Sequence, residues 1–246
     1  MGLRFVQSEG LSPALLATEE RGAACLLDWR SEQRNAHYDH RDLPLPGGAQ
    51  EALARDLLDV AAAVYLADLA APRERNEDWV REIELVLPVR EVDFWRAQEP
   101  LVAGLLQRLS GDNFTLEFHP RGGEPAPPPG AAPDLLTDSV CLVSGGLDSA
   151  CGAVMLLRTA HHPRLVMHRS GNPVVAQAQD RLTETLEARW AGQSALSAVR
   201  LAPSSHRTGA LPYLAPELRE PSRRCRSWLF LTLGTVAAAA VSPFRC

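Results

Sequence analysis

The sequence contains no lysine, and all 25 of its basic residues are arginine. A Walker-A loop needs a lysine to reach the nucleotide phosphates, so this class of phosphate site is excluded. Schiff-base chemistry with pyridoxal phosphate and ligation through a nucleotidylated lysine need the same amine and are excluded too. An anion site in this chain must therefore work without lysine.

Cysteine is also scarce, because the chain has five cysteines and no CxxC pair. So few scattered cysteines in a chain of this length do not make a disulfide framework, and their spacing predicts no zinc site. We expect reduced thiols. The N-terminal residues MGLRFVQSEG lack the apolar core of a signal peptide, so we expect a cytoplasmic protein.

Long apolar runs and a basic surface are missing as well. The longest apolar run, residues 228–241, is shorter than the roughly 20 residues that span a bilayer. It predicts a buried core helix and no membrane partner. The net charge of −5 leaves no global basic field that would attract nucleic acid.

A stretch rich in proline and glycine, PRGGEPAPPPGAAP, occupies residues 120–133 and contains six prolines. It offers almost no apolar surface to bury, which is typical of a semi-rigid extended linker. Since domains average roughly 150 residues, the chain length suggests one large domain or two small ones. We therefore predict an N-terminal domain over residues 1–119 and a C-terminal domain over residues 134–246.

The hydrophobic pattern before the linker predicts a small α/β domain. Apolar residues at helical spacing predict helices over residues 50–69 and 94–109, the second either continuous or divided at Pro100. Alternating polar and apolar residues predict strands over residues 82–87, ending near Pro88, and over residues 113–118.

The pattern after the linker alternates strands with helices. The expected strands are residues 139–143, 164–168 and 195–201. The expected helices are residues 148–158, 173–190 and 224–241. This alternation predicts an α/β domain with a parallel sheet, helices on its faces, and ligands beyond the carboxyl ends of its strands.

The strand expected at residues 139–143 leads directly into the sequence SGGLDS and then into a helix. Two adjacent glycines, Gly145 and Gly146, allow a sharp turn that brings backbone N–H groups close to a ligand. The helix start adds N–H donors and a partial positive charge, so this segment predicts an anion site. Asp148 is expected to cap the helix or to hold a magnesium ion carried by phosphates. A capped turn that binds no ligand is the alternative interpretation.

SGGLDS resembles the pyrophosphate loop (PP-loop) of the N-type ATP pyrophosphatases, whose parallel-sheet domain is HUP-like and Rossmann-like. In that superfamily the loop grips the β- and γ-phosphates, and ATP is split into AMP and pyrophosphate. The resemblance implies ATP and Mg2+ as cofactors and a set of ATP-binding residues in this chain. These residues are Val143, Ser144, Gly145, Gly146, Leu147, Asp148, Ser149 and His168.

Within that superfamily the chain looks most like the QueC-like 7-cyano-7-deazaguanine synthases. The resemblance covers CLVSGGLDSACGAVMLL, RLVMHRSGNPVVAQAQDRL and SRRCRSWLFLTLG. It implies Asp148 and Arg226 as catalytic residues, with Asp148 also the magnesium ligand. Housekeeping members carry a four-cysteine zinc cluster and continue beyond the apolar helix. This chain lacks that cluster, so we expect no zinc site and a C-terminal domain that is short for the family.

The N-terminal half carries a second resemblance. AVYLADLAAPR and DWVREIELVLPV look like the extra domain of QueC-like proteins in bacterial anti-phage systems of the Qat and type IV CBASS-associated kinds. Asp68, Trp79 and Arg81 belong to these stretches, and the sequence assigns them no chemical role. The two resemblances imply adenylation of the carboxylate of a 7-deazaguanine, 7-carboxy-7-deazaguanine. A nitrogen nucleophile then displaces AMP, either ammonia or an amine on a protein from a defence operon.

Two other functions use the same loop. One is a tRNA-modifying PP-loop enzyme, which usually needs a cysteine pair and a basic RNA-binding surface that this sequence lacks. The other is a non-catalytic ATP-binding module that assembles a defence complex. Pyrophosphate release in the presence of substrate separates the enzyme from the module.

Overall fold

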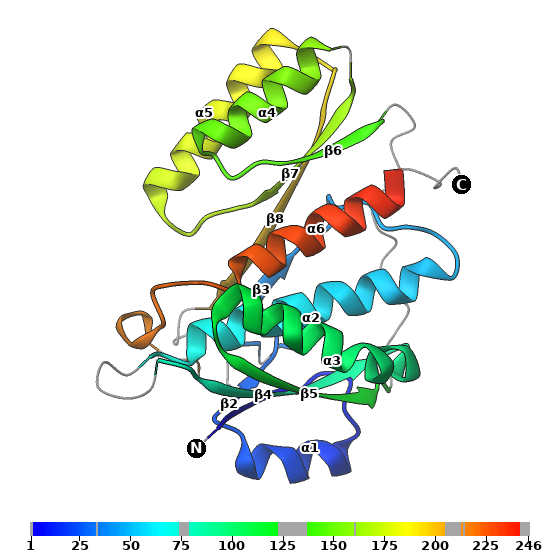
Figure 1. Cartoon of the computed structure of the whole chain (residues 1–246), viewed down its shortest axis with the longest axis vertical. Helices are drawn as coiled ribbons and strands as arrows, with labels where there is room; N and C mark the ends of the chain where they lie inside the picture. The colour runs from blue at the N-terminus through cyan, green and yellow to red at the C-terminus, as the bar shows by residue number, and fades with distance from the viewer. Residues whose placement is uncertain are drawn as a thin grey trace. The chain divides into compact units, whose positions relative to one another are not determined.

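The computed structural model of the chain describes residues 2–32, 34–73, 79–122, 137–159, 161–204, 213 and 215–241. It is an α/β structure with one all-parallel sheet of four strands and a second, mixed sheet of four strands (Figure 1). The expected α/β class is confirmed. None of the helices formed by the described residues is both long and apolar enough to cross a membrane.

The chain forms two compact units. Unit 1 comprises Met1–His37, Asp56–Pro127 and Ala202–Leu229, and unit 2 comprises Tyr38–Arg55, Pro128–Leu201 and Phe230–Cys246. The chain therefore passes between the units more than once. Residues 123–133 of the expected linker lie outside the described residues, and the domain boundaries drawn from the sequence stay a prediction.

Unit 1 contains the all-parallel sheet, with the strand order β2-β1-β4-β5. Its strands are β1 (Leu3–Gln7), β2 (Cys25–Leu27), β4 (Glu82–Val89) and β5 (Asn113–Pro120). Its helices are α1 (Pro13–Glu19), α2 (Gln50–Ala70, from Asp56 onward), α3 (Val92–Ser110), and the 3-10 turns η1 (Glu20–Gly22) and η2 (Pro216–Leu218). The helices and strands predicted before the linker are confirmed as α2, α3, β4 and β5. The sequence pattern did not predict β1, β2 and α1.

Helices cover both faces of this sheet. Val6 and Val86 pack with the apolar side chains of α1 on one face. On the other face the rings of Trp95 in α3 and Phe118 in β5 lie with centroids 5.6 Å apart. Both faces of the sheet are therefore buried, as is typical of parallel sheets.

Two prolines lie inside these elements. β4 continues past Pro88 to Val89, because β1 pairs with β4 only as far as Val86 and β5 alone pairs with the last residues. The missing N–H of Pro88 therefore removes no bond to β1. Likewise α3 runs unbroken through Pro100, and its buried side chains, which include Trp95, Val102 and Leu106, hold it on the sheet.

Unit 2 contains the mixed sheet, with the strand order β3-β8-β7-β6. Its strands are β6 (Ser139–Leu142), β7 (Pro163–His168), β8 (Ala195–Pro203, as far as Leu201) and β3 (Ala36–Asp39, from Tyr38 onward), and the first three run parallel. Its helices are α4 (Leu147–Arg158), α5 (Pro173–Arg189) and α6 (Arg226–Val241, from Phe230 onward). The predicted strand–helix alternation is confirmed. β3 was not predicted, and it turns the expected parallel sheet into a mixed one.

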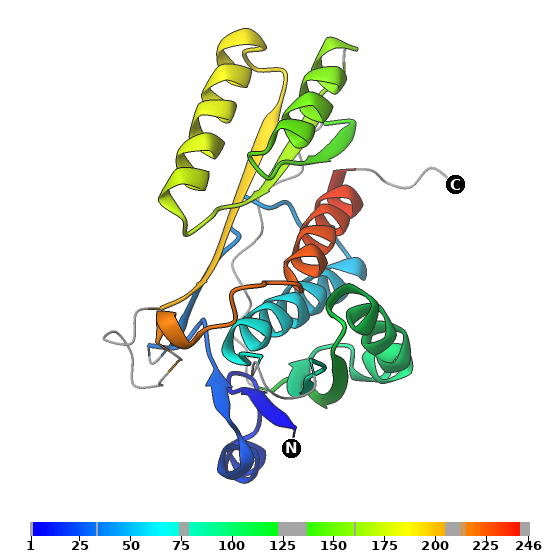
Figure 2. The ribbon, with the colours of Figure 1, turned by 60° about the vertical axis from the view of Figure 1, so that its left-hand side comes forward.

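The two faces of this sheet carry different helices. Leu165 and Met167 of β7 pack with buried side chains of α4 and α5, and these two helices lie side by side (Figure 2). On the opposite face the ring of His168 meets that of Phe230 in α6, with centroids 6.1 Å apart. Buried Leu233, Val236 and Ala237 confirm that the longest apolar run forms a core helix.

Candidate anion-binding site

The SGGLDS segment connects the end of β6 to the start of α4. Buried Val143 donates its N–H to the carbonyl of Val166, which ties the end of β6 to β7 at 2.8 Å. The chain then turns outward, and Ser144 and Gly146 are exposed. The loop thus lies at the carboxyl edge of two parallel strands, where ligands bind in α/β sheets.

The conformation of the loop requires glycine at one position. Gly145 has a φ of +89°, which side-chain-bearing residues rarely adopt. A Cβ atom at Gly145 would lie 2.8 Å from Cγ of Gln179 in α5. Gly146 differs, because its φ is −88° and its Cβ would meet only Oγ of Ser144 at 3.5 Å. The predicted glycine turn therefore depends on Gly145.

Two serine hydroxyls hold the loop from inside. Ser149 Oγ accepts from the N–H of Ser144 at 3.2 Å and donates to the carbonyl of Gly146 at 2.9 Å. Ser144 Oγ accepts from the N–H of Gly146 at 3.3 Å and lies 3.2 Å from Ser149 Oγ. These bonds preorganise the turn, which lowers the entropic cost of binding an anion there.

The start of α4 remains open to a ligand. Its N-cap is Gly146, and no side chain caps it. Asn172, by contrast, caps α5 by accepting from the N–H groups of Val174 and Val175. The first N–H groups of a helix have no partner within the helix, so those of Leu147 and Asp148 have neither an intrahelical acceptor nor a side-chain cap. Of the two helix starts, that of α4 is the one able to receive an anion.

Of the two roles expected for Asp148, helix cap or magnesium ligand, the cap is wrong. Gly146 occupies the cap, and Asp148 lies in the first turn of α4 with an exposed side chain. The reason is that the turn closes one residue after Gly145, before the chain reaches Asp148. An exposed carboxylate beside open N–H groups fits a single ligand to a magnesium ion that phosphates carry. Among the described residues no group of three or more His, Cys, Asp and Glu side chains could hold a metal ion by itself.

Gln179 is a residue of this site that sequence reasoning missed. Its side chain is fully buried, and its amide reaches the loops that follow both β6 and β7. A glutamine in the middle of α5 carries no motif. The one available signal was its position within an amphipathic helix, on the face that the helix buries against the sheet.

Two predicted site residues, His168 and Arg226, lie outside the loop segment. The His168 side chain is 3% exposed, and its Nε2 lies 3.0 Å from the carbonyl of Leu201, so its ring belongs to the interior of unit 2. Arg226 is the first residue of α6 and belongs to unit 1, whereas the loop belongs to unit 2. Contacts of His168 and Arg226 with ATP stay predictions.

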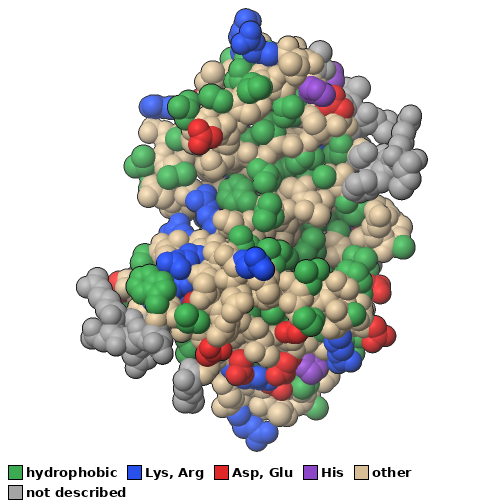
Figure 3. Space-filling model, in the orientation of Figure 1, with side chains coloured by type: hydrophobic (Ala, Val, Ile, Leu, Met, Phe, Trp, Pro, Cys, Tyr) green, Lys and Arg blue, Asp and Glu red, His purple; other side chains and the backbone are tan. Residues whose placement is uncertain are grey.

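Several large hydrophobic side chains of unit 2 remain exposed around the helices that follow the loop. Leu147 and Met155 of α4 and Val174 of α5 are 78%, 69% and 75% exposed. Figure 3 shows many hydrophobic and few charged side chains over the part of the surface formed by α4 and α5. The two most exposed residues, Leu147 and Val174, each lie in the first turn of a helix.

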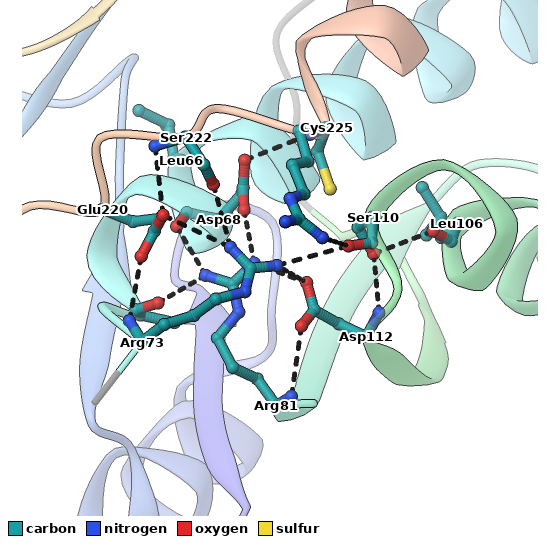
Figure 4. A network of polar contacts seen from close by, with 12 residues as sticks. Leu66, Asp68, Arg73, Arg81, Leu106, Ser110, Asp112, Glu220, Ser222 and Cys225 are labelled. Atoms are coloured by element: carbon teal, nitrogen blue, oxygen red, sulfur yellow. Dashed lines mark hydrogen bonds and ion pairs between the residues drawn. The ribbon is translucent and has the colours of Figure 1, made fainter. Parts of the chain in front are cut away.

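Unit 1 contains a second concentration of charge, which is structural. Arg81 pairs with Asp68 at 2.5 Å and Asp112 at 2.6 Å, and both carboxylates are fully buried (Figure 4). Arg73 pairs with Asp112 at 2.5 Å and Glu220 at 3.3 Å. Burial opposes ionisation, yet the bonds from Arg81 outweigh it and lower the pKa of Asp112. This network gives Asp68 and Arg81 a role in holding the fold.

The same network anchors the segment that precedes α6. The N–H of Cys225 donates to Asp68 at 3.1 Å (Figure 4). The side chain of Arg224 donates to the carbonyl of Ser110 at 2.9 Å. Glu220 accepts from the N–H of Arg73 at 2.9 Å. These bonds explain why residues 202–229 belong to unit 1 although they follow the sheet of unit 2.

No family model, no curated protein and no solved structure matches the chain.

Proposed function

We propose that the loop 144–149 binds the phosphates of ATP and that the chain is an ATP-dependent, AMP-forming ligase of the QueC-like kind. One observation carries the proposal. A positive-φ glycine, held against Gln179, turns the chain from a parallel strand into a helix start that has no side-chain cap. This arrangement supplies backbone donors and a partial positive charge to an anion, so the site needs no lysine.

The proposed reaction joins a carboxylate to a nitrogen. An oxygen of the carboxylate of 7-carboxy-7-deazaguanine attacks the α-phosphorus of ATP, the α–β bridging bond breaks, and pyrophosphate leaves. The lone pair of a nitrogen nucleophile then attacks the carboxyl carbon of the adenylate, and AMP leaves with the bonding electron pair. The nitrogen loses a proton and an amide forms.

The residues of the chain contribute mainly by electrostatics and positioning. The N–H groups at the start of α4 stabilise the charge that develops on the departing pyrophosphate. Arg226 adds positive charge in the proposed mechanism, as its match to the family implies. Bound Mg2+ would neutralise phosphate charge, and Asp148 is the residue that would hold it. The bonds of Ser144 and Ser149 keep the backbone of the loop in a fixed geometry.

The resemblances leave two acceptors of the activated carboxylate open. The resemblance to the housekeeping synthases implies ammonia, and the resemblance to the defence-linked proteins allows an amine on a protein. Mass spectrometry of the products formed from ATP, 7-carboxy-7-deazaguanine and either ammonia or a candidate protein distinguishes the two. A non-catalytic module would bind ATP and release no pyrophosphate in any of these mixtures.

The first test of the proposal is ligand binding and turnover in the Asp148→Asn variant. Because Asp148 is exposed and does not cap α4, the variant should melt like the wild type. Losing the charge that organises the metal should slow pyrophosphate release by about 10- to 100-fold, which corresponds to roughly 1.4–2.8 kcal/mol. Unchanged turnover in a stable variant would show that Asp148 does not hold the metal. If ATP, AMP and pyrophosphate all leave the melting temperature of the wild type unchanged, the proposed function is wrong.

A further inference from the structure

Gln179 connects the two loops at the carboxyl edge of the sheet of unit 2. Its Nε2 donates to the carbonyl of Ser144 at 3.3 Å and to that of His168 at 3.0 Å. Its Oε1 accepts from the N–H of Ser170 at 3.1 Å. One buried amide therefore satisfies three backbone groups, in the segment after β6, at the last residue of β7 and in the segment after β7.

The contact with the glycine turn is steric as well as polar. Gln179 Cγ occupies the space that a Cβ of Gly145 would need, 2.8 Å away. The turn is thus held from two sides, by the hydrogen bond at Ser144 and by the packing at Gly145. Gln179 itself sits on α5, which is fixed at its start by the Asn172 cap.

We infer that Gln179 is the positioning residue of the anion loop, and that its hydrogen bonds keep the loop in the conformation that binds phosphate. Gln179 does not touch the ligand in this account, because it is buried behind the loop and its donors are used by backbone carbonyls. It acts through the backbone of Ser144 and Gly145. The effect on ligand affinity rests on the proposed function, whereas the effect on the loop does not.

The Gln179→Glu variant tests the hydrogen bonds separately from the packing. Glutamate has the same size, but its carboxylate cannot donate and would face two carbonyl oxygens. Protonation restores one donor, and burial beside carbonyls raises the pKa of such a carboxyl. At about pH 8 the charged carboxylate should therefore no longer hold the loop by hydrogen bonds. At about pH 5.5 the protonated form should largely restore the bound conformation of the loop. A residue that only filled space would show no such dependence on pH.

The readout is hydrogen exchange of the hydrogen-bonded amides of Ser144, Gly146 and Ala150, compared at each pH with the Gln177→Glu variant. Gln177 lies on the same helix but is exposed, so it controls for the added charge. At the higher pH we expect exchange in Gln179→Glu to be at least about 10-fold faster than in the control. Gln179→Met, which keeps the length and has no donor, should release the loop at both pH values and covers the case in which the Glu variant unfolds.

Two outcomes overturn the inference. One is equal exchange in the variants and the control at every pH. The other is a Gln179→Glu defect of the same size at both pH values, which assigns the effect to packing. Titration with inorganic pyrophosphate then separates the two proposals. If the wild type does not bind pyrophosphate while the exchange pattern is as expected, the proposed function fails and the positioning role of Gln179 stands.

Discussion

Gly145 is the residue whose replacement the loop should tolerate least. An alanine there must adopt a positive φ and push against Gln179. We expect Gly145→Ala to lower the free energy of unfolding by about 2 kcal/mol. Affinity for pyrophosphate should fall by at least about 10-fold, because the N–H groups of the loop lose their alignment. Chemical denaturation and calorimetric titration measure the two effects.

Gly146→Ala is the matched control for this change. Gly146 has a negative φ and room for a Cβ, so the variant loses only the preference for glycine over alanine at a helix cap. That difference costs up to about 1 kcal/mol. Equal losses of unfolding free energy and of pyrophosphate affinity in the two variants would show that the loop does not depend on the positive φ of Gly145.

At the scale of elements, two helices of unit 2 differ in how closely they pack against their neighbours. A Cβ at Gly152 of α4 would meet no atom within 4 Å, whereas at Gly234 of α6 it would lie 3.0 Å from Leu142 in β6. The first glycine therefore reflects no packing constraint, and the second allows α6 to approach the sheet.

Replacing each of these glycines with alanine should give opposite results. Gly152→Ala should raise the free energy of unfolding by about 0.5–1 kcal/mol, because alanine favours a helix interior. Gly234→Ala gains the same propensity but has to displace Leu142, so we expect no gain or a net loss. Thermal unfolding of the two variants beside the wild type measures the difference. A gain from Gly234→Ala as large as that from Gly152→Ala would contradict the close packing of α6.

The ion-pair network of unit 1 also acts between elements. Asp112→Asn leaves the buried guanidinium groups of Arg73 and Arg81 without their shared carboxylate. Removing one partner of a buried pair costs about 3–5 kcal/mol. Asp39→Asn, at an exposed pair with Arg41, should cost less than about 1 kcal/mol. Similar losses in the two variants would show that the network does not stabilise unit 1.

The contribution of Asp112 should also depend on pH. Its pKa is lowered in the folded chain, so its stabilisation is fully present above the pKa of an unfolded aspartate, about 3.9. The stabilisation is lost as the pH falls below that value through the lowered folded pKa. Between about pH 4 and pH 2 the wild type should therefore lose more stability than Asp112→Asn does. Denaturation curves across this range give the comparison.

At the scale of the whole molecule, each unit takes segments from both sides of the expected linker. Residues 38–55 precede the linker and belong to unit 2, and residues 202–229 follow it and belong to unit 1. A specific protease site inserted between Gly130 and Ala131 would cut the chain in this region. We expect the two fragments to stay associated on size-exclusion chromatography without denaturant, because each unit contains residues from both fragments. Two separately eluting folded fragments would contradict this organisation.

Local pattern in the sequence predicted the elements that surround the candidate site. The strand before SGGLDS, the helices after it and the apolar helix near the C-terminus all lie within about two residues of their expected bounds. The turn at Gly145 and Gly146 was predicted from the same kind of local signal, because a glycine pair between a strand and a helix marks a tight turn, although the sequence did not show which glycine has the positive φ. Such features depend on residues that are close in sequence.

The tertiary structure alone decided the features that join distant residues. β3 pairs with β8 across more than 150 positions, Asp68 receives the N–H of Cys225, and Gln179 reaches back to Ser144. No periodicity marks such pairs, because each partner has the same local pattern whether or not the other is near. The cap is the same case on a smaller scale: Gly146 is the N-cap of α4, and Asp148, whose side chain is typical of a cap, lies in the first turn.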